Sequence, residues 1–586
     1  QAEDGIRDVE RSRGLGDVYK RQLLYLLLGL IIACNDTNQN KSNDTAPFSE
    51  EIHIDDDFYF EKGIYQVVDN VYVAIGYGLA NSVLIVGETG NIIIDTTEDP
   101  ALGKQINQEF KKISNLPNEA IIYTHSHVDH WRGAPGFYEE GTKVYAHSTF
   151  KKGFFDQNNL LRPILTERGM KQFGHFLPDS LKRGHGLGFT LNFDFEQPPV
   201  IYPTNFFELQ TNQLSVGGIN LEIQHTPGET DDQIIIYYPD KNVVVSADNY
   251  YMRFPNLYTI RGTSYRDTKS WYRSVDTMRS YKPQYLISCH GPFLSGEQTI
   301  EERLSIYRDA IQYIHDYAVR GANLGKTPDE LVEEFEYPPF FLENYDLQEK
   351  YGKVSWSIRN VYNGYLGFFD GRAVNLEPLS DMKRAGYIYG LIGSKDKLIE
   401  EINNANNNEN YQWAAELSDI GLFNFPDDRE IKKLYSTSLE NLSLIEKNPI
   451  ARNYYLSEAY ELSEKIFPSL KYTVSAEQVK NIPLSTFFDA MGPRLDPIKA
   501  KNKFIKVGFN ITDSGEKFGI VIRNQIAEIS NFYNDDYDVI VSVDSQTWKG
   551  IILRTESAAR AIASGKLSID GESLKFLQFS SLFVND

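Results

Sequence analysis

The sequence predicts an α/β sandwich, followed by an α-helical domain and a smaller α+β domain. Strand-like and helix-like segments alternate between residues 51 and 320, whereas residues 380–465 carry only helix-like patterns. Residues 470–586 return to short strands with a helix. At 586 residues the chain is too long for one hydrophobic core, which agrees with several domains. We expect residues 321–379 to connect the first two domains and to pack on the sandwich.

The N-terminus resembles the signal of an exported bacterial protein. Residues 23–32 form an apolar run of signal-peptide length that follows two basic residues and is too short to span a bilayer. The run leads into Ile31-Ile32-Ala33-Cys34, which resembles a lipobox, whose cysteine is lipidated and starts the mature protein. An ordinary signal peptide that happens to contain a cysteine is the alternative.

This resemblance implies a location outside the cytoplasm. We expect residues 1–34 to be a leader with a lipoprotein signal peptide, and residues 35–50 to be a polar tether. The protein is then an exported bacterial lipoprotein, periplasmic or associated with the outer membrane, with membrane contact through lipidated Cys34. The charged stretch 1–22 begins with Gln1 and is interpreted as a non-native leader.

The composition limits which ligands the protein can bind and which side chains could hold a metal ion. The net charge of −22 disfavours non-specific nucleic-acid binding, because a polyphosphate would be repelled. The two cysteines, Cys34 and Cys289, are too few for a disulfide framework or a cysteine-built metal site. Any metal ion must therefore be held by histidine and carboxylate side chains.

The first domain opens with a predicted hairpin and helix, and four later strands end in possible metal ligands. A rigid sheet can place ligands from separate strand ends at one edge, so this repetition is unlikely to arise by chance. The predicted hairpin joins 83–86 to 92–95 and the helix covers 101–113; the four strands are 120–123, 219–223, 243–245 and 285–288, followed by His125, Glu229, Asp248 and His290.

His125, His127, Asp129 and His130 form the motif H-x-H-x-D-H. In an extended loop, residues two apart point the same way, so His125 and His127 can bind one ion. Asp129 and His130 then turn toward a second ion. Zinc accepts imidazole and carboxylate ligands in an open geometry that leaves room for water. A buried histidine in a core is the ordinary alternative, but three histidines and an aspartate within six residues, in a chain with ten histidines, argue against it.

The arrangement of these motifs resembles the metallo-β-lactamase fold, which implies that the α/β sandwich is of the αββα type, with helices outside two sheets. Thr226-Pro227-Gly228-Glu229-Thr230 resembles its third ligand motif, with Glu229 where most members carry histidine, although Asp231 or Asp232 could serve instead. Asp248 stands where the fold places a bridging carboxylate, and His290 matches the final histidine. The resemblance implies two zinc ions, the first held by His125, His127 and Glu229, the second by Asp129, His130 and His290, with Asp248 as the bridge.

Such a pair of zinc ions, about 3.5 to 4 Å apart, lowers the pKa of a bridging water and so generates hydroxide for hydrolysis. Asp129 and Asp248 are therefore the predicted catalytic carboxylates. Redox chemistry is disfavoured, because the flavodiiron branch of the fold has a flavin domain and none is evident here.

The later domains have simpler patterns. In the helical domain, 413–417 and 453–456 are predicted helical, separated by an Asn-rich turn at 403–410 and by Pro426. The last domain contains no histidine, which makes it a poor candidate for the chemistry. Its predicted strands are 504–511, 518–523 and 539–543, and its predicted helix, 556–563, ends at Gly565.

The order of these domains resembles that of the bacterial alkyl sulfatases of the SDS-hydrolase type. Segments that look like family segments are 256–262, 351–355 with 361–370, 413–417 and 487–496. The resemblance implies hydrolysis of an alkyl sulfate, or a similar amphiphilic anionic ester, to alcohol and sulfate. It also implies a homodimer formed through residues 380–465, and a sterol-carrier-like fold with an apolar groove in residues 470–586. A purely structural lid is the alternative for that last domain.

In that family an asparagine and an arginine hold the sulfate, and the matching positions are Asn256 and Arg261. A guanidinium supplies directed donors that replace the hydration of the sulfate. Tyr258 and Arg266 are secondary candidates, with surface or packing roles as the alternative. The sequence departs from the family at Asp248, where well-known members have glutamate, and at Cys289 to Pro292, which replace a His-His-Trp-Pro type segment.

Two other classes remain open from the sequence. A lactonase, a phosphodiesterase or a β-lactamase would use the same zinc centre. A non-catalytic lipid-binding lipoprotein would use only the last domain, but its retained ligand set would then be unexplained.

Overall fold

The computed structural model describes residues 61–182, 184–188, 199–463, 476, 478–534 and 536–583. The predicted leader, Cys34 and the polar tether lie outside the described residues. Within these residues, no helix is both long enough and apolar enough to cross a membrane.

The first sheet of the N-terminal sandwich domain has seven strands in chain order, β1 to β7. Its first four strands are antiparallel, and the predicted hairpin is present as β3 and β4. From β4 onward neighbouring strands are parallel. The strands are β1 Gly63–Val68, β2 Val71–Ile75, β3 Ser82–Val86, β4 Asn91–Ile94, β5 Asn118–Ile122, β6 Lys143–His147 and β7 Asn205–Phe207.

The second sheet has six strands in the order β13-β12-β11-β10-β9-β8. β11 and β12 are parallel, and β9 runs in the same direction because both it and β11 are antiparallel to β10. The ends of these three strands therefore meet at one edge. The strands are β8 Thr211–Val216, β9 Ile219–His225, β10 Ile234–Tyr238, β11 Val243–Ala247, β12 Tyr285–Ser288 and β13 Leu294–Ser295.

Continuous apolar runs place these strands between two layers of side chains. Side chains such as Ile94 and Ile122 of the first sheet meet Ile223 and Val245 of the second in one buried core. Helix α2 covers the outer face of the first sheet, while α6, α7 and α10 pack on the outer face of the second. The αββα sandwich is thus confirmed. The helices are α2 Pro100–Ile113, α6 Thr268–Ser280, α7 Glu297–Asn323, α8 Pro328–Glu333, α9 Pro339–Glu343 and α10 Val354–Leu366.

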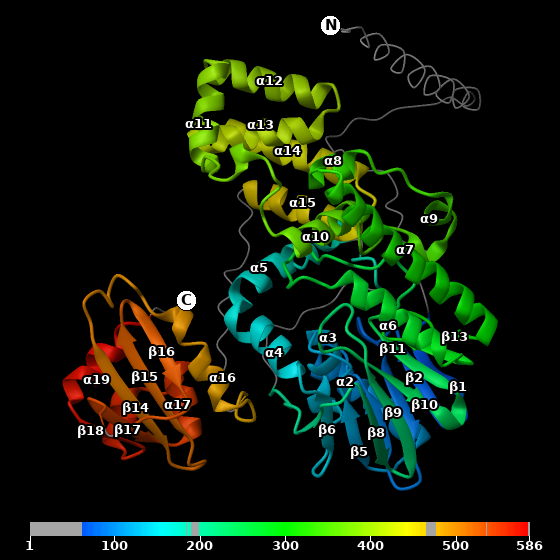
Figure 1. Cartoon of the computed structure of the whole chain (residues 1–586), viewed down its shortest axis with the longest axis vertical. Coiled ribbons are helices and arrows are strands. Elements are labelled where there is room, and N and C mark those ends of the chain that lie inside the picture. The colour runs from blue at the N-terminus through cyan, green and yellow to red at the C-terminus, as the bar shows by residue number, and fades with distance from the viewer. Residues whose placement is uncertain are drawn as a thin grey trace, which may run out of the picture. The chain divides into compact units, whose positions relative to one another are not determined.

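The helical domain follows, and Figure 1 shows α11 to α14 lying side by side. The Asn-rich turn predicted at 403–410 is wrong for most of its length, because α12 continues to Asn407. Asn403 and Asn408 donate their side-chain amides to carbonyls one turn earlier, so they extend the helix instead of ending it. The helices are α11 Asp381–Ile392, α12 Lys395–Asn407, α13 Tyr411–Asn424, α14 Arg429–Ile445 and α15 Pro449–Leu462.

The last domain contains a five-stranded sheet in the order β16-β15-β14-β17-β18. The three predicted strands are present, whereas β16, β18 and the helices α16, α17 and α19 were not predicted. Helix α18 begins two residues later than predicted, because the Ser557 side chain caps it. The elements are α16 Leu484–Asp489, β14 Ile505–Ile511, β15 Lys517–Arg523, β16 Ile526–Ser530, β17 Val539–Val543, α17 Ser545–Ile552, α18 Ala558–Ala563, β18 Leu567–Gly571 and α19 Ser573–Ser580.

Candidate metal centre

The predicted ligands lie at the ends of four strands, as the sequence indicated. His125 lies in the loop after β5, and His127 is the residue before the short helix α3, Val128–Trp131. Asp129 and His130 lie within that helix, which is why their side chains face a different direction from those of His125 and His127. Glu229, Asp248 and His290 follow β9, β11 and β12.

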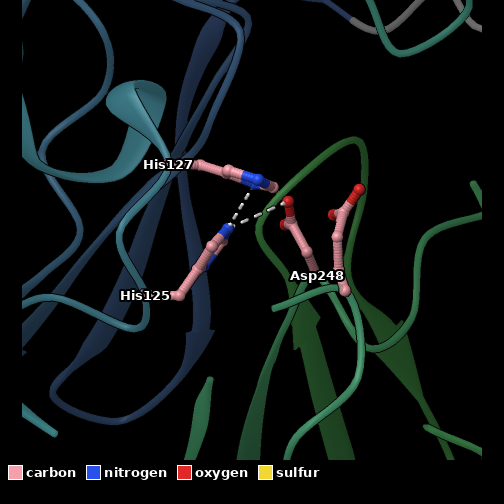
Figure 2. Close-up of side chains that lie close together, drawn as sticks. His125, His127 and Asp248 are labelled. Atoms are coloured by element: carbon pink, nitrogen blue, oxygen red, sulfur yellow. Dashed lines mark hydrogen bonds and ion pairs between the residues drawn. The ribbon is translucent and has the colours of Figure 1, made fainter. Parts of the chain in front are cut away.

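These side chains form two groups. Within each group, the ligand atoms all lie within 4.8 Å of one another. All are buried except Asp129, which keeps 17% of its side chain exposed. Figure 2 shows His125 and His127 pointing toward each other and toward Asp248. One group is His125, His127, Glu229 and Asp248, and the other is Asp129, His130 and His290.

The carboxylate of Asp248 lies between the two groups. Its Oδ2 is 3.6 Å from Nε2 of His125 and 3.3 Å from Nε2 of His130. Its Oδ1 is 3.2 Å from Nε2 of His290. One carboxylate thus reaches histidines of both groups, which is the position that a bridging ligand needs.

The second nitrogen of two histidines is held by a hydrogen bond. Nδ1 of His130 lies 2.7 Å from Oδ2 of Asp95, and Nδ1 of His290 lies 2.9 Å from the carbonyl oxygen of Leu79. Donation at Nδ1 leaves Nε2 of both rings free to face the carboxylates. Hydrogen bonds of this kind fix the ring orientation and the tautomer of a metal-binding histidine.

The two groups differ in their electrostatics. Burial, with the neighbouring His130, lowers the pKa of His125 well below its usual range, so this ring is neutral. Burial also opposes a charge on His290, but the carboxylate of Asp248 outweighs that effect and raises the pKa of His290 to about 9. Neutral imidazole is the form that binds a metal. A metal ion must therefore displace a proton at His290 but not at His125.

The choice among the three acidic residues after β9 follows from their positions. Glu229 is buried and belongs to the first group. Asp232 is also buried, but it accepts a hydrogen bond from the Ser126 hydroxyl, and Asp231 is exposed. Neither aspartate belongs to a ligand group among the described residues.

The residues predicted to bind substrate fall into two sets. Arg261 lines the cavity described below, and its Nη2 lies 3.3 Å from Nε2 of His127. Arg266 is buried and makes an ion pair with Glu229, so it contacts a predicted ligand. Asn256 is buried behind it and accepts from Arg266 through its backbone carbonyl. Tyr258 is half-buried and does not line the cavity.

Both ligand groups open onto a cavity of about 210 Å³. Helix α5, Arg162–Gln172, contributes part of its wall, through residues such as Leu165 and Met170. The apolar wall is completed by Leu79, Val128, Trp131, Phe173 and Val200. The cavity therefore combines a charged end at the ligand groups with an apolar body, which suits an amphiphilic anion.

The sequence analysis missed three residues of this site, Asp95, Glu98 and Leu79. Asp95 accepts from the backbone and the hydroxyl of Thr124 and from the thiol of Cys289, in addition to its contact with His130. Glu98 accepts from the backbone N–H of Leu79, the residue that orients His290. The one available signal for Asp95 was its place at the end of the predicted strand 92–95.

The residues present fit metal ions. The set is imidazole and carboxylate, which zinc accepts. Nε2 of His130 and Oδ1 of Asp248 are buried and make no well-aligned hydrogen bond, although buried polar atoms normally have one; their neighbours are Oδ2 of Asp248 at 3.3 Å and Nε2 of His290 at 3.2 Å. Both atoms face the other ligands, so a bound cation would satisfy them.

Three parts of the chain match known families. Residues 75–290 match the metallo-β-lactamase superfamily, residues 327–465 match a family described as alkyl sulfatase dimerisation, and residues 472–585 match one described as alkyl sulfatase C-terminal.

Individual relatives agree with these matches. The chain is 32% identical over 518 residues to a linear primary-alkylsulfatase of a Pseudomonas species, covering 85% of this chain and 98% of the relative. It is 27% identical to an (R)-specific secondary-alkylsulfatase of a Pseudomonas species, covering 89% and 80%. The structure of Pisa1, described as a stereoselective inverting sec-alkylsulfatase from a Pseudomonas species, matches with a TM-score of 0.83 and 26% identity over 90% of this chain and 85% of Pisa1.

Proposed function

Because the chain belongs to the alkyl sulfatase family of the metallo-β-lactamase superfamily, we propose that it hydrolyses alkyl sulfate esters to alcohol and sulfate at a two-zinc centre. The observation that carries the proposal is the shared position of Asp248, between two ligand groups at the charged end of an apolar cavity.

Each ion would have its own set of side chains. His125, His127 and Glu229 would hold one ion, Asp129, His130 and His290 the other, and Asp248 both. Zinc bound in this way supplies a water of lowered pKa as the nucleophile. The chain contributes orientation: Asp95 and the Leu79 carbonyl keep two of the histidine rings turned toward the carboxylates.

The sulfate end of the substrate requires a positively charged side chain that does not already hold a predicted metal ligand. Arg261 meets this requirement, because its guanidinium lines the cavity beside His127 and its Nη1 is steadied by the Thr259 hydroxyl at 2.9 Å. A guanidinium presents several donors in a fixed plane, which suits the oxygens of a sulfate. Arg266 acts instead on the centre itself, by holding Glu229 in place.

Asn256 keeps its predicted role as a second sulfate contact. Both atoms of its side-chain amide are buried without a hydrogen-bond partner, as are Nε and Nη2 of Arg266. These groups are close to each other, since Arg266 donates to the Asn256 carbonyl oxygen.

The alkyl chain would occupy the apolar body of the cavity. Leu165 and Met170 of α5 lie on one wall, with Trp131 and Phe173 also in contact with the space. Burial of a methylene group contributes about 0.8 kcal/mol, so the chain supplies binding energy that the hydrophilic sulfate lacks. We therefore propose medium-chain to long-chain alkyl sulfates as substrates.

The proposal extends to the assembly and the location. We propose a homodimer, supported by the match of residues 327–465 to the dimerisation family. We also propose an exported lipoprotein held at a membrane through Cys34, supported by the lipobox-like sequence. If Cys34→Ala leaves the protein equally membrane-bound in fractionated cells, the lipobox interpretation is wrong. A lipid-binding, sterol-carrier-like role for residues 470–586 stays a prediction.

Substrate turnover in labelled water tests the reaction. We expect sulfate release from dodecyl sulfate, and much slower turnover of a lactone, a phosphodiester and a β-lactam. The label distinguishes the bond: ¹⁸O in the alcohol indicates C–O cleavage and ¹⁸O in the sulfate indicates S–O cleavage. Preferred turnover of one of the other three substrates would replace the sulfatase proposal with that activity.

A further inference from the structure

Gln172, the last residue of helix α5, is fully buried and contacts the loop that carries Arg261. Its side-chain oxygen Oε1 accepts two hydrogen bonds, one from the backbone N–H of Arg261 at 2.9 Å and one from the hydroxyl of Thr259 at 3.0 Å. The same hydroxyl accepts a hydrogen bond from Nη1 of Arg261 at 2.9 Å. Gln172 therefore holds Arg261 at its backbone and, through Thr259, at its guanidinium.

The chemistry of these groups allows only one direction for the hydrogen bonds. A backbone N–H can only donate, so the atom of the Gln172 amide that faces Arg261 must be the oxygen. A hydroxyl has one proton and two lone pairs. Because the Thr259 hydroxyl donates its proton to Gln172, only its lone pairs remain for the guanidinium of Arg261. The position of one oxygen of Gln172 thus determines where a guanidinium donor can bind.

The contact with Thr259 orients the guanidinium of Arg261 and leaves most of its donors for a ligand. A guanidinium carries five N–H groups in one rigid plane. Nη1 bonds to Thr259, and Nη2 lies 3.3 Å from Nε2 of His127. Because the group is planar, holding Nη1 also restricts the plane in which the other donors lie. Arg261 lines the cavity, so these donors lie at the end where we propose that the sulfate binds.

Helix α5 also packs against the Arg261 loop at two further points. A Cβ added at Gly169 of α5 would lie 3.9 Å from Cδ of Arg261, which is ordinary van der Waals contact. Gly262 has a φ of +110°, and a Cβ added there would lie 3.3 Å from Cδ2 of Leu165. Leu165 and Gly169 line the cavity as well. One helix therefore forms the apolar wall for the alkyl chain and supports the arginine proposed to bind the sulfate.

The C-terminal end of α5 is itself held by buried polar side chains of helix α15. Asn453 donates its side-chain amide to the carbonyl oxygens of Gln172 at 3.4 Å and Gly184 at 3.0 Å. Ser457, one turn later, donates its hydroxyl to the carbonyl oxygen of Lys171 at 3.4 Å. A buried network of satisfied hydrogen bonds favours a single arrangement of the groups in it. The backbone that carries the Gln172 side chain therefore has a defined position.

We propose that Gln172 is a positioning residue, which keeps Arg261 in the orientation that binds the sulfate end of the substrate. The inference rests on the proposed alkyl sulfate hydrolysis and adds a residue that the sequence did not single out. Gln172 is not among the described residues that line the cavity, so it acts through Arg261 and not by contact with the substrate. Its replacement should therefore affect the binding of an alkyl anion only while Arg261 is present.

Calorimetric titration of the zinc-loaded protein with octanesulfonate, which has no ester bond to hydrolyse, tests the proposal. Gln172→Met keeps the length of the side chain and removes the accepting oxygen, so affinity should fall about 10-fold with zinc content unchanged. Thr259→Val should cause a similar loss, and Thr259→Ser, which keeps the hydroxyl, should restore most of it. In an Arg261→Ala background, Gln172→Met should have no further effect, because residues that act as one unit are not additive.

The Arg261→Ala background distinguishes positioning from a general loss of packing. Equal weakening by Gln172→Met with and without Arg261 would indicate a merely structural role and overturn the proposal. Undiminished affinity in Gln172→Met, binding that does not depend on Arg261, or a Thr259→Ser variant as weak as Thr259→Val would also overturn it. If Gln172→Met does not fold, the two Thr259 variants decide the question. Absence of sulfate release from dodecyl sulfate would contradict the proposed function, whereas the sulfonate affinities report on Gln172 independently of turnover.

Discussion

The strand ends of the hydrolase domain and residues 365–391, which run from the end of α10 into α11, show opposite exceptions to the usual burial of apolar and exposure of polar side chains. At the strand ends, charged and polar side chains such as Asp248 and His130 are buried, whereas in the segment apolar side chains such as Phe368 are exposed. Burial of a charge costs free energy unless an opposite charge or a metal ion pairs with it. A large exposed apolar patch is likewise unfavourable unless a binding partner covers it. We propose that a partner from outside the chain completes each region, metal ions in the first case and a second subunit in the second.

The largest expected effect comes from removing a charged ligand. Asp129→Ala should lose one of two bound metal ions and reduce dodecyl sulfate turnover by about 10²-fold to 10³-fold, because the remaining ligands leave the ion under-coordinated. Metal analysis and turnover measure this together. Asp231→Ala is the control, since Asp231 is acidic, nearby and exposed. Full metal content with near-normal turnover in Asp129→Ala would contradict the assignment of the buried charges.

The next effect separates substrate binding from metal binding. Arg261→Ala should reduce dodecyl sulfate turnover by about 10²-fold, or about 2.7 kcal/mol, with metal content unchanged. Lysine should restore part of the loss, because it supplies the charge without the planar fork. Arg273→Ala, at an exposed position on α6, should have no effect. If Arg261→Ala and the unaltered enzyme turn over the alkyl sulfate equally, Arg261 does not hold the sulfate.

A smaller effect on metal affinity should follow from a substitution of Asp95, the residue that orients His130. Asp95→Asn keeps the shape of the side chain but removes the charge that accepts from Nδ1 of His130. Loss of such a contact typically weakens metal affinity about 10-fold to 100-fold. Competition with a chelator measures the affinity. Asp99→Asn, which leaves a good N-cap on α2, is the matched control. Equal affinities for Asp95→Asn and Asp99→Asn would show that Asp95 is not needed at the centre.

The smallest effect concerns buried polar groups that are not ligands. The rings of His147 and His225 stack at 3.7 Å, and burial together with the charge of His225 lowers the pKa of His147 to about 4. The unfolded chain, with a histidine pKa of about 6.5, then binds more protons than the folded one between pH 6.5 and 4. Stability conferred by this pair is therefore present above pH 6.5 and is lost as the pH falls toward 4.

Replacement of His147 by phenylalanine keeps a ring in the stack and removes the titration. From pH 7 to pH 5 the unaltered protein should lose about 1 kcal/mol more unfolding free energy than His147→Phe, a discounted figure because solvent reaches part of the pair. Urea unfolding at the two pH values measures the difference. Parallel losses in the two proteins would remove the pair as a source of pH dependence.

The sequence predicted those features that depend on local pattern. Apolar runs such as 243–245 located the buried strands, and polar residues directly after them located the ligand groups, because strand ends meet at a sheet edge. The αββα layering followed from the resemblance to the metallo-β-lactamase fold.

Features that depend on distant contacts could not be predicted. Arg266 was a candidate for binding substrate, and only the folded chain brings it to Glu229, 37 positions away. Cys289 stood out in the sequence only as a departure from the family, and only the folded chain brings its thiol to Asp95, to which it donates, outside the lining of the cavity. The turn predicted at 403–410 was wrong for most of its length because the packing of α12 on its neighbours outweighs the low intrinsic helix propensity of asparagine.

Zinc titration of the metal-free enzyme tests the central claim most directly. Protein stripped with a chelator should release no sulfate from dodecyl sulfate, and activity should return with added zinc and level off at two ions per chain. The account predicts that stoichiometry because Asp248 belongs to one ligand group and its carboxylate lies within 3.3 Å of two histidines of the other. Sulfate release by the metal-free protein, or full activity at one ion per chain, would contradict the account.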